Sequence, residues 1–274
     1  MFAKLLKYEW KANVRLLATL SLCMLGVALL GALDLRAIIA FASNESGDSF
    51  TGLLMIPAVL FLVFAYIALI LYVGGTQFYL QYRFYKTRFT DEGYLTFTLP
   101  VKTSHIFLSS ALHILIWQII AACVLLLSLG VVIGLGVPWG TLNAEATAES
   151  LQEMAFEIQL LWEVSSLRYY LLVIPVSLIS AVILPMSAIV LGAVVAKKHK
   201  LLAAIGIMYG VSTFTGIVSG MISVISSIIA MSADMNIDTV MAITPLLSMI
   251  LPAVLAGCGY FLSIYLMKNK LNLP

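Results

Sequence analysis

The chain has 274 residues, of which 62% are hydrophobic and only 10% are charged, and its mean hydropathy is +1.07. Soluble domains average about 45–50% apolar and about 25% charged residues, and a globule of this size cannot enclose so much apolar surface. The composition therefore excludes a soluble enzyme, a disordered chain and a nucleic-acid-binding protein, and it predicts an integral membrane protein.

Residues 1–15 form a short basic stretch before the first apolar run. Lys4, Lys7, Lys11 and Arg15 alternate there with apolar side chains that are available for one helix face. This pattern predicts a helix at the membrane interface, with its lysines near anionic headgroups. The alternative is a simple positive anchor for the first span.

Six stretches are long and apolar enough to cross a hydrocarbon core, which takes about 20 residues. Backbone polar groups in lipid must be satisfied within the segment, so we expect all six to be helices. The predicted fold is a single all-α membrane domain, residues 1–274, with spans at 16–33, 53–80, 106–137, 169–196, 201–231 and 242–267.

Two of the connecting segments are informative. Residues 81–105 mix charges with six Tyr and Phe residues, which is typical of a docking surface rather than of a solvated loop. Residues 138–168 carry an acidic stripe opposite an apolar one, which predicts an amphipathic helix. The stripe is either a solvated surface or an acidic vestibule for cationic cargo, and it consists of Glu145, Glu149, Glu153 and Glu157.

Charge is divided between the two sides of the predicted topology. The N-terminus, the 81–105 loop, the turn between spans four and five and the C-terminus carry 13 of the 15 Lys and Arg residues. The remaining segments carry ten of the 13 acidic residues. By the positive-inside rule, both termini and the 81–105 loop are expected in the cytoplasm.

Motifs for chemistry are missing from the chain. No glycine is followed by lysine, so there is no P-loop for ATP. The three histidines are scattered, and no metal-binding spacing is present. The predicted spans hold no acidic or basic residue near the midplane, whereas an ion-coupled carrier usually places one there. We expect no catalytic site, no metal and no cofactor on this chain.

The fifth span carries many small and hydroxyl-bearing residues. Two Gly-x-x-x-Gly repeats allow close helix approach. Either the stripe serves ordinary packing within the chain, or it faces a second copy or a cargo path. Its residues are Gly206, Gly210, Thr213, Gly216, Ser219, Gly220 and Ser223.

The segment DEGYLTFTLPV at residues 91–101 resembles the EGYL-x-x-x-LP motif of ABC-2 type transporter permeases from Gram-positive bacteria. In that family the motif lies between the second and third spans. The remaining layout is similar as well, with a basic N-terminal helix, six spans and both ends inside. Only the eleven-residue motif is specific.

The resemblance implies that residues 81–105 contain a coupling helix that docks on a separate ATP-binding subunit. Phe89, Tyr94, Leu95 and Phe97 would be its apolar anchors. Asp91 and Glu92 would cap it or pair with basic residues, Gly93 would allow close approach, and Pro100 would set the exit into span three. ATP and Mg would bind two copies of the partner, and two permease chains, expected to be identical, would pair in the bacterial plasma membrane.

Cargo is open at this stage. In the family, part of the segment between spans five and six often folds back into the membrane, and residues 222–245 are apolar enough for that. An uncharged interior and an acidic outer face favour export of an amphipathic peptide, such as a toxin or antimicrobial. Drugs or lipids are the alternative cargo, and a carrier or sensor without an ATPase is the alternative class.

Overall fold

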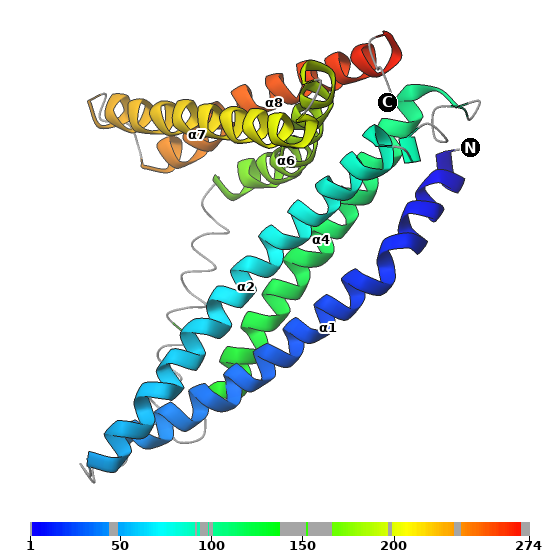
Figure 1. Ribbon diagram of the computed structural model, residues 1–274. Coiled ribbons are helices and arrows are strands. Elements are labelled where there is room, and N and C mark those ends of the chain that lie inside the picture. The colour runs from blue at the N-terminus through cyan, green and yellow to red at the C-terminus, as the bar shows by residue number, and fades with distance from the viewer. Residues whose placement is uncertain are drawn as a thin grey trace. The chain divides into compact units, whose positions relative to one another are not determined.

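The computed structural model describes residues 2–43, 49–90, 92–93, 98, 101–137, 152, 166–196, 199–232 and 237–269. Within these residues the chain forms six long helices and no strand (Figure 1). They are α1 (Phe2–Ser43), α2 (Ser49–Phe89), α4 (Thr103–Gly136), α6 (Ser166–Val195), α7 (Lys200–Ser232) and α8 (Ile237–Asn269).

All six helices are long and apolar enough to cross a membrane. The six-span all-α prediction is therefore confirmed, and the protein is a multi-pass membrane protein. Large apolar side chains such as Phe64, Leu71 and Leu126 are mostly exposed on the helix surfaces. Such surfaces are stable in contact with lipid and would aggregate in water.

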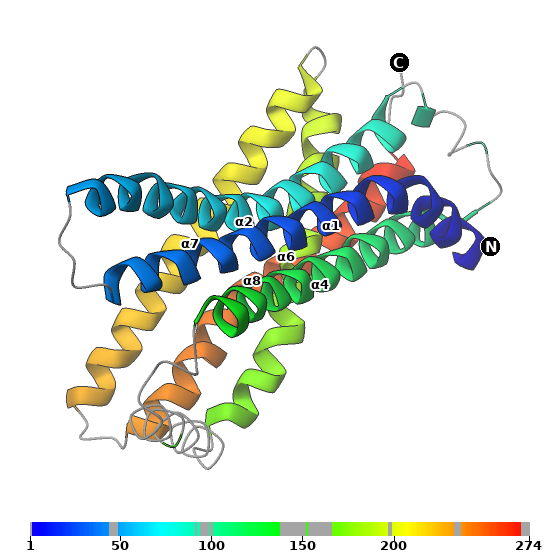
Figure 2. The same ribbon diagram turned by 90° about the horizontal axis from the view of Figure 1, so that it is seen from below.

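The chain divides into two compact units. The first, here called the three-helix unit, comprises Lys7–Leu80 and Ile116–Glu153. Its parts of α1, α2 and α4 run side by side in both views (Figures 1 and 2). Tyr72, Ala121 and Val124 form a buried apolar cluster there, against which residues of α1 pack.

Three further contacts between the helices add to this packing. The Ser21 hydroxyl of α1 lies 2.7 Å from the Tyr72 hydroxyl of α2, and the indole rings of Trp10 and Trp117 stack with centroids 5.0 Å apart. Leu35 can lie close to α4 because residue 136 is a glycine. A Cβ at position 136 would lie 2.8 Å from a Leu35 methyl carbon. These contacts join α1 to α2 and to α4.

The second unit, here called the C-terminal unit, comprises Met1–Leu6, Gln81–Leu115 and Met154–Pro274. Within it α6 packs against both α7 and α8. The α6–α7 turn is tight, because a Cβ at Gly192 would lie 2.4 Å from the backbone of Ala204. A Cβ at Gly259 of α8 would lie 2.8 Å from the Ser187 hydroxyl oxygen of α6. The Gly192 contact needs a glycine because it is with backbone, whereas at Gly259 the Ser187 side chain would have to shift.

The N-terminal segment differs from expectation. Residues 2–15 are not a separate helix but the first four turns of α1, which continues without a break to Ser43. The physical reason is composition, because residues 2–25 contain no glycine or proline and consist mainly of good helix formers.

The segment between the fifth and sixth spans, for which the sequence left a fold back into the membrane open, lies mostly on the two flanking helices. Residues 222–232 continue α7, and residues 237–245 are the first turns of α8. The described part of 222–245 therefore contains no separate segment that folds back. The fifth predicted span, 201–231, coincides with one continuous helix, Lys200–Ser232.

Candidate functional site

The loop between α2 and α4 is shorter than the predicted 81–105 segment. Helix α2 continues nine residues past Leu80 and ends at Phe89, and α4 begins at Thr103. The Gly93 amide donates to the Thr90 carbonyl at 2.8 Å and forms a turn. Glu92 is exposed and Gly93 is buried. The other motif residues, namely Asp91, Tyr94, Leu95, Phe97 and Pro100, lie outside the described residues.

Both ends of this loop lie in an aromatic cluster, here called the aromatic platform. It consists of the buried Phe84, Phe89 and Phe107 and the half-buried Tyr85 and Tyr260. The Phe84 ring meets Phe89 edge-on at 5.7 Å and Phe107 at 6.1 Å. Tyr85 stacks on Phe89 at 6.3 Å. Such pairs contribute about 0.5–1.5 kcal/mol each beyond the area they bury, so the last turn of α2 is fixed to the first turns of α4.

A buried arginine adds a polar link between the same two helices. Arg88 is 5% exposed, and its Nη2 donates to the Ser110 hydroxyl of α4 at 3.3 Å. Ser110 also donates to the Ile106 carbonyl at 3.2 Å. A buried guanidinium is costly without partners. The hydrogen bond to Ser110 therefore favours the arrangement of α2 and α4 in which Arg88 is paired.

The burial of Phe89 corrects one expectation. Its side chain is 2% exposed and packs inside the platform, so it is not a surface anchor for a partner in this conformation. The reason is that α2 continues to this residue, so that the Phe89 ring packs against Phe84 and Tyr85 of the same helix. The other three expected apolar anchors, Tyr94, Leu95 and Phe97, lie outside the described residues.

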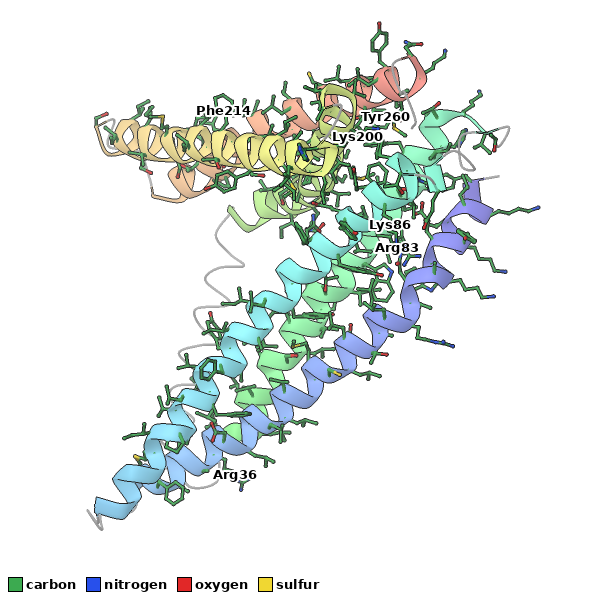
Figure 3. The ribbon with its side chains drawn as sticks, viewed as in Figure 1. Arg36, Arg83, Lys86, Lys200, Phe214 and Tyr260 are labelled. Carbon is green, nitrogen blue, oxygen red and sulfur yellow. The ribbon has the colours of Figure 1, made fainter. Side chains whose placement is uncertain are left out.

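The platform also reaches the last helix. The Phe107 ring, fully buried, meets Tyr260 of α8 at 5.7 Å and an interplanar angle of 69°. Figure 3 shows Tyr260 on α8 and Arg83 and Lys86 on the last turns of α2. Packed rings therefore connect the α2 and α4 ends of the loop to α8.

The glycines of the small-residue stripe of α7 do not pack closely against other described parts of the chain. A Cβ added at Gly206, Gly210, Gly216 or Gly220 would meet nothing within 4 Å. Thr213 is exposed and its hydroxyl donates to the carbonyl of Tyr209, one turn before it. The interpretation of this stripe as ordinary internal packing is therefore wrong for its glycines.

Two other members of the stripe, Ser219 and Ser223, are half-buried. The Ser219 hydroxyl donates to the Ser248 carbonyl of α8 at 3.1 Å. Phe214 is 57% exposed on the same helix (Figure 3). The stripe thus divides into an α8-facing edge around Ser219 and an open glycine face.

The acidic stripe of Glu145, Glu149, Glu153 and Glu157 lies outside the described residues. In the part of the chain that the structure describes, no group of three His, Cys, Asp or Glu side chains is placed to hold a metal ion.

The sequence did not point to Arg88, Phe107 and Tyr260 as members of one site. Phe107 and Tyr260 lie within long apolar runs, where nothing in the local spacing marks a contact between residues 153 positions apart. Only the tertiary packing of α4 against α8 brings them together. No protein-family model, curated protein or solved structure matches this chain.

Proposed function

We propose that the protein is the transmembrane permease subunit of an ATP-driven exporter of the ABC-2 type. The observation that carries this proposal is the DEGYLTFTLPV segment, because it falls in the loop whose two ends are held by the aromatic platform. A loop that receives force from a partner must be supported at both ends, and otherwise the force is lost in local bending. The platform supplies that support.

The missing nucleotide motif fits the same proposal. The chain has no P-loop, so ATP and Mg would bind a separate subunit present in two copies. The loop would dock in a groove of that subunit through Tyr94, Leu95 and Phe97, with Glu92 exposed beside them. Both termini and this loop would lie in the cytoplasm, as the distribution of Lys and Arg favours.

The path from docking to transport would run through α8. Movement of the loop ends would reach Tyr260 by way of Phe107, which lies 5.7 Å from it. Helix α8 in turn bonds α7 through Ser219, and through the Ser226 and Thr244 hydroxyls, which lie 3.0 Å apart. Helix α7 carries the open glycine face, which would contact a second permease chain or line the cargo path.

We further propose that the cargo is an amphipathic peptide. The described spans are uncharged near their centres, and the open face of α7 offers glycines with exposed Thr213 and Ser227 hydroxyls. A face of this kind accepts varied apolar and polar groups without selecting one charge. The acidic 138–168 segment would favour a cationic peptide on the outer side.

Reconstitution tests this function. The chain and a candidate ATP-binding subunit from the same organism would be incorporated together in proteoliposomes, and ATP hydrolysis would be measured with cationic amphipathic peptides, lipids and drugs. We expect the peptides to stimulate hydrolysis. Stimulation by lipids or drugs alone would refute the peptide cargo, and failure of the two proteins to form a complex would refute the permease assignment.

A further inference from the structure

Helix α8 contains a proline near its middle. Pro252 lies well inside the helix, which runs from Ile237 to Asn269. A proline has no N–H to donate, so the carbonyl four residues earlier, that of Ser248, loses its partner within the helix. In lipid no bulk water replaces that partner, and an unsatisfied carbonyl is costly. The Ser248 carbonyl therefore needs a donor from outside α8.

The neighbouring helix supplies this donor. The Ser219 hydroxyl of α7 donates to the Ser248 carbonyl at 3.1 Å, and both residues are half-buried. Thr213 and Ser227 of α7 bond differently, because their hydroxyls donate to carbonyls one turn earlier on α7 itself. Serine and threonine inside helices commonly make such local bonds. Ser219 departs from the local pattern at the point where α8 has a carbonyl to satisfy.

The two parts of α8 on either side of Pro252 have different neighbours. Before the proline, the Thr244 hydroxyl lies 3.0 Å from the Ser226 hydroxyl of α7. After it, the Tyr260 ring meets the Phe107 ring of α4 with centroids 5.7 Å apart. The first part of α8 is therefore bonded to α7, and the last part packs against the aromatic platform.

A glycine follows the proline closely in the same helix. Gly257 is exposed, and a Cβ at this position would meet nothing within 4 Å, so no close contact requires a glycine there. Glycine is less favourable than alanine inside a helix, and proline interrupts the ladder of hydrogen bonds. The stretch from Pro252 to Gly257, here called the hinge, therefore resists bending less than an unbroken helix does.

We propose that α8 bends at this hinge and that the Ser219 hydroxyl holds the hinge in the position seen in this structure. On bending, the Ser219 hydroxyl turns to a carbonyl one turn earlier on α7, as the Thr213 and Ser227 hydroxyls already do. The donor thus keeps a partner, and the cost of bending lies in the Ser248 carbonyl that it leaves. The inference goes beyond the proposed function, since it needs no ATP-binding subunit.

The bend moves α7 together with the first part of α8. Near its start α7 is fixed by the close contact of Ala204 with Gly192 of α6, and towards its end it is bonded to α8 through Ser226. Its displacement is therefore largest at that end. A bend of about 20° displaces the first turn of α8, about 22 Å from Pro252 along the helix, by about 8 Å.

A double-mutant cycle tests the role of the hydrogen bond. Ser219→Ala is measured in wild type and beside Pro252→Ala, which restores a donor for the Ser248 carbonyl within α8. Reversible unfolding of the full chain in mixed detergent micelles is the assay. We expect Ser219→Ala to raise the unfolding equilibrium constant about tenfold in wild type, and less than about threefold beside Pro252→Ala. Equal costs in the two backgrounds would overturn the inference.

Two controls separate this bond from general packing. Ser248→Ala removes a side-chain hydroxyl but keeps the carbonyl, so beside it Ser219→Ala should again cost about tenfold. Ser227→Ala removes an exposed hydroxyl from the same helix and should change the constant less than about twofold in either background. A cost of Ser219→Ala that disappears beside Ser248→Ala would show that the side chain, not the freed carbonyl, is the acceptor, and would overturn the inference.

Distances between spin labels test the bending itself. The labels are attached through Leu108→Cys on α4 and Ile228→Cys on α7, both exposed, and double electron–electron resonance is recorded in nanodiscs. The three native cysteines are replaced by alanine in this chain; they are Cys23, Cys123 and Cys258.

We expect two distances in wild type, a larger share of the minor one with Ser219→Ala, and a single narrow distribution with Pro252→Ala. One distribution common to all three proteins would overturn the hinge, even if the double-mutant cycle confirms the hydrogen bond.

Discussion

The α6–α7 turn provides a sharp test of the helix packing through Gly192→Ala. A Cβ at this position would lie 2.4 Å from the Ala204 N and Cα atoms and 2.8 Å from its Cβ. Carbon atoms pack at about 3.5–4.0 Å, so the two helices would have to separate by about 1 Å. Backbone atoms cannot rotate away as a side chain does, and Ala204 is 1% exposed.

The magnitude follows from two opposing terms. Overpacking of this kind costs about 1–3 kcal/mol, whereas alanine in a helix is up to about 1 kcal/mol more favourable than glycine. We therefore expect Gly192→Ala to lower the free energy of unfolding by about 1–2 kcal/mol. Gly206→Ala on α7 is the matched control, because its Cβ meets nothing within 4 Å. It should be neutral or stabilising by up to about 1 kcal/mol.

Reversible unfolding in mixed detergent micelles, followed by circular dichroism, measures both variants against wild type. The expected gap between the two variants is about 2 kcal/mol, or about 30-fold in the unfolding equilibrium constant. Equal stabilities would mean that α6 and α7 do not approach closely at Gly192. A destabilised Gly206→Ala in monomeric protein would contradict the open face of α7.

Three further predictions concern the core and are measured by the same unfolding assay. Phe107→Ala, which truncates the fully buried ring of the aromatic platform, should cost about 3–5 kcal/mol, and a cost below 1 kcal/mol would mean that the platform is loosely packed. A double-mutant cycle with Ser21→Ala and Tyr72→Phe should give a coupling of about 0.6 kcal/mol for their 2.7 Å contact, whereas strict additivity would contradict that hydrogen bond. Ser109→Ala should cost about 1 kcal/mol more in unfolding free energy than Ser128→Ala. Both side chains are 0% exposed, but only the Ser109 hydroxyl has a described acceptor, the Ile106 carbonyl at 3.0 Å. Equal costs would show that Ser128 is bonded as well.

The spans were predictable from sequence because a membrane helix is a local property. An apolar run of sufficient length must be helical in lipid, and no distant residue changes that. The ends of the spans were less predictable. Helix α2 continues to Phe89 although charge appears at Arg83, because a helix does not need to stop where the hydrocarbon stops. The same reasoning explains why α1 begins at Phe2.

The site was predictable only where a motif marked it. The loop motif identified the segment between α2 and α4, but nothing local distinguished the buried Phe89 from the other aromatic residues of 81–105. The partners of Phe89 come from its own helix, and the platform that contains them depends on Phe107 and Tyr260, which are distant in sequence. Likewise, nothing in the sequence distinguishes Gly192 from Gly206. In the structure a Cβ at Gly192 would clash with Ala204, whereas a Cβ at Gly206 would meet nothing within 4 Å.

The central claim is that the loop after α2 docks a separate ATP-binding subunit. The most direct measurement is the affinity of the purified chain in nanodiscs for a purified candidate ATP-binding subunit from the same organism, with wild type compared with Tyr94→Ala/Phe97→Ala. Phe214→Ala is the control, because it removes an exposed aromatic ring of α7 far from the loop in sequence. Interface anchors contribute about 2 kcal/mol or more each. We predict that the double variant loses at least about 30-fold in affinity while the control binds as wild type does. Absence of binding by wild type, or equal binding by all three proteins, would contradict the claim.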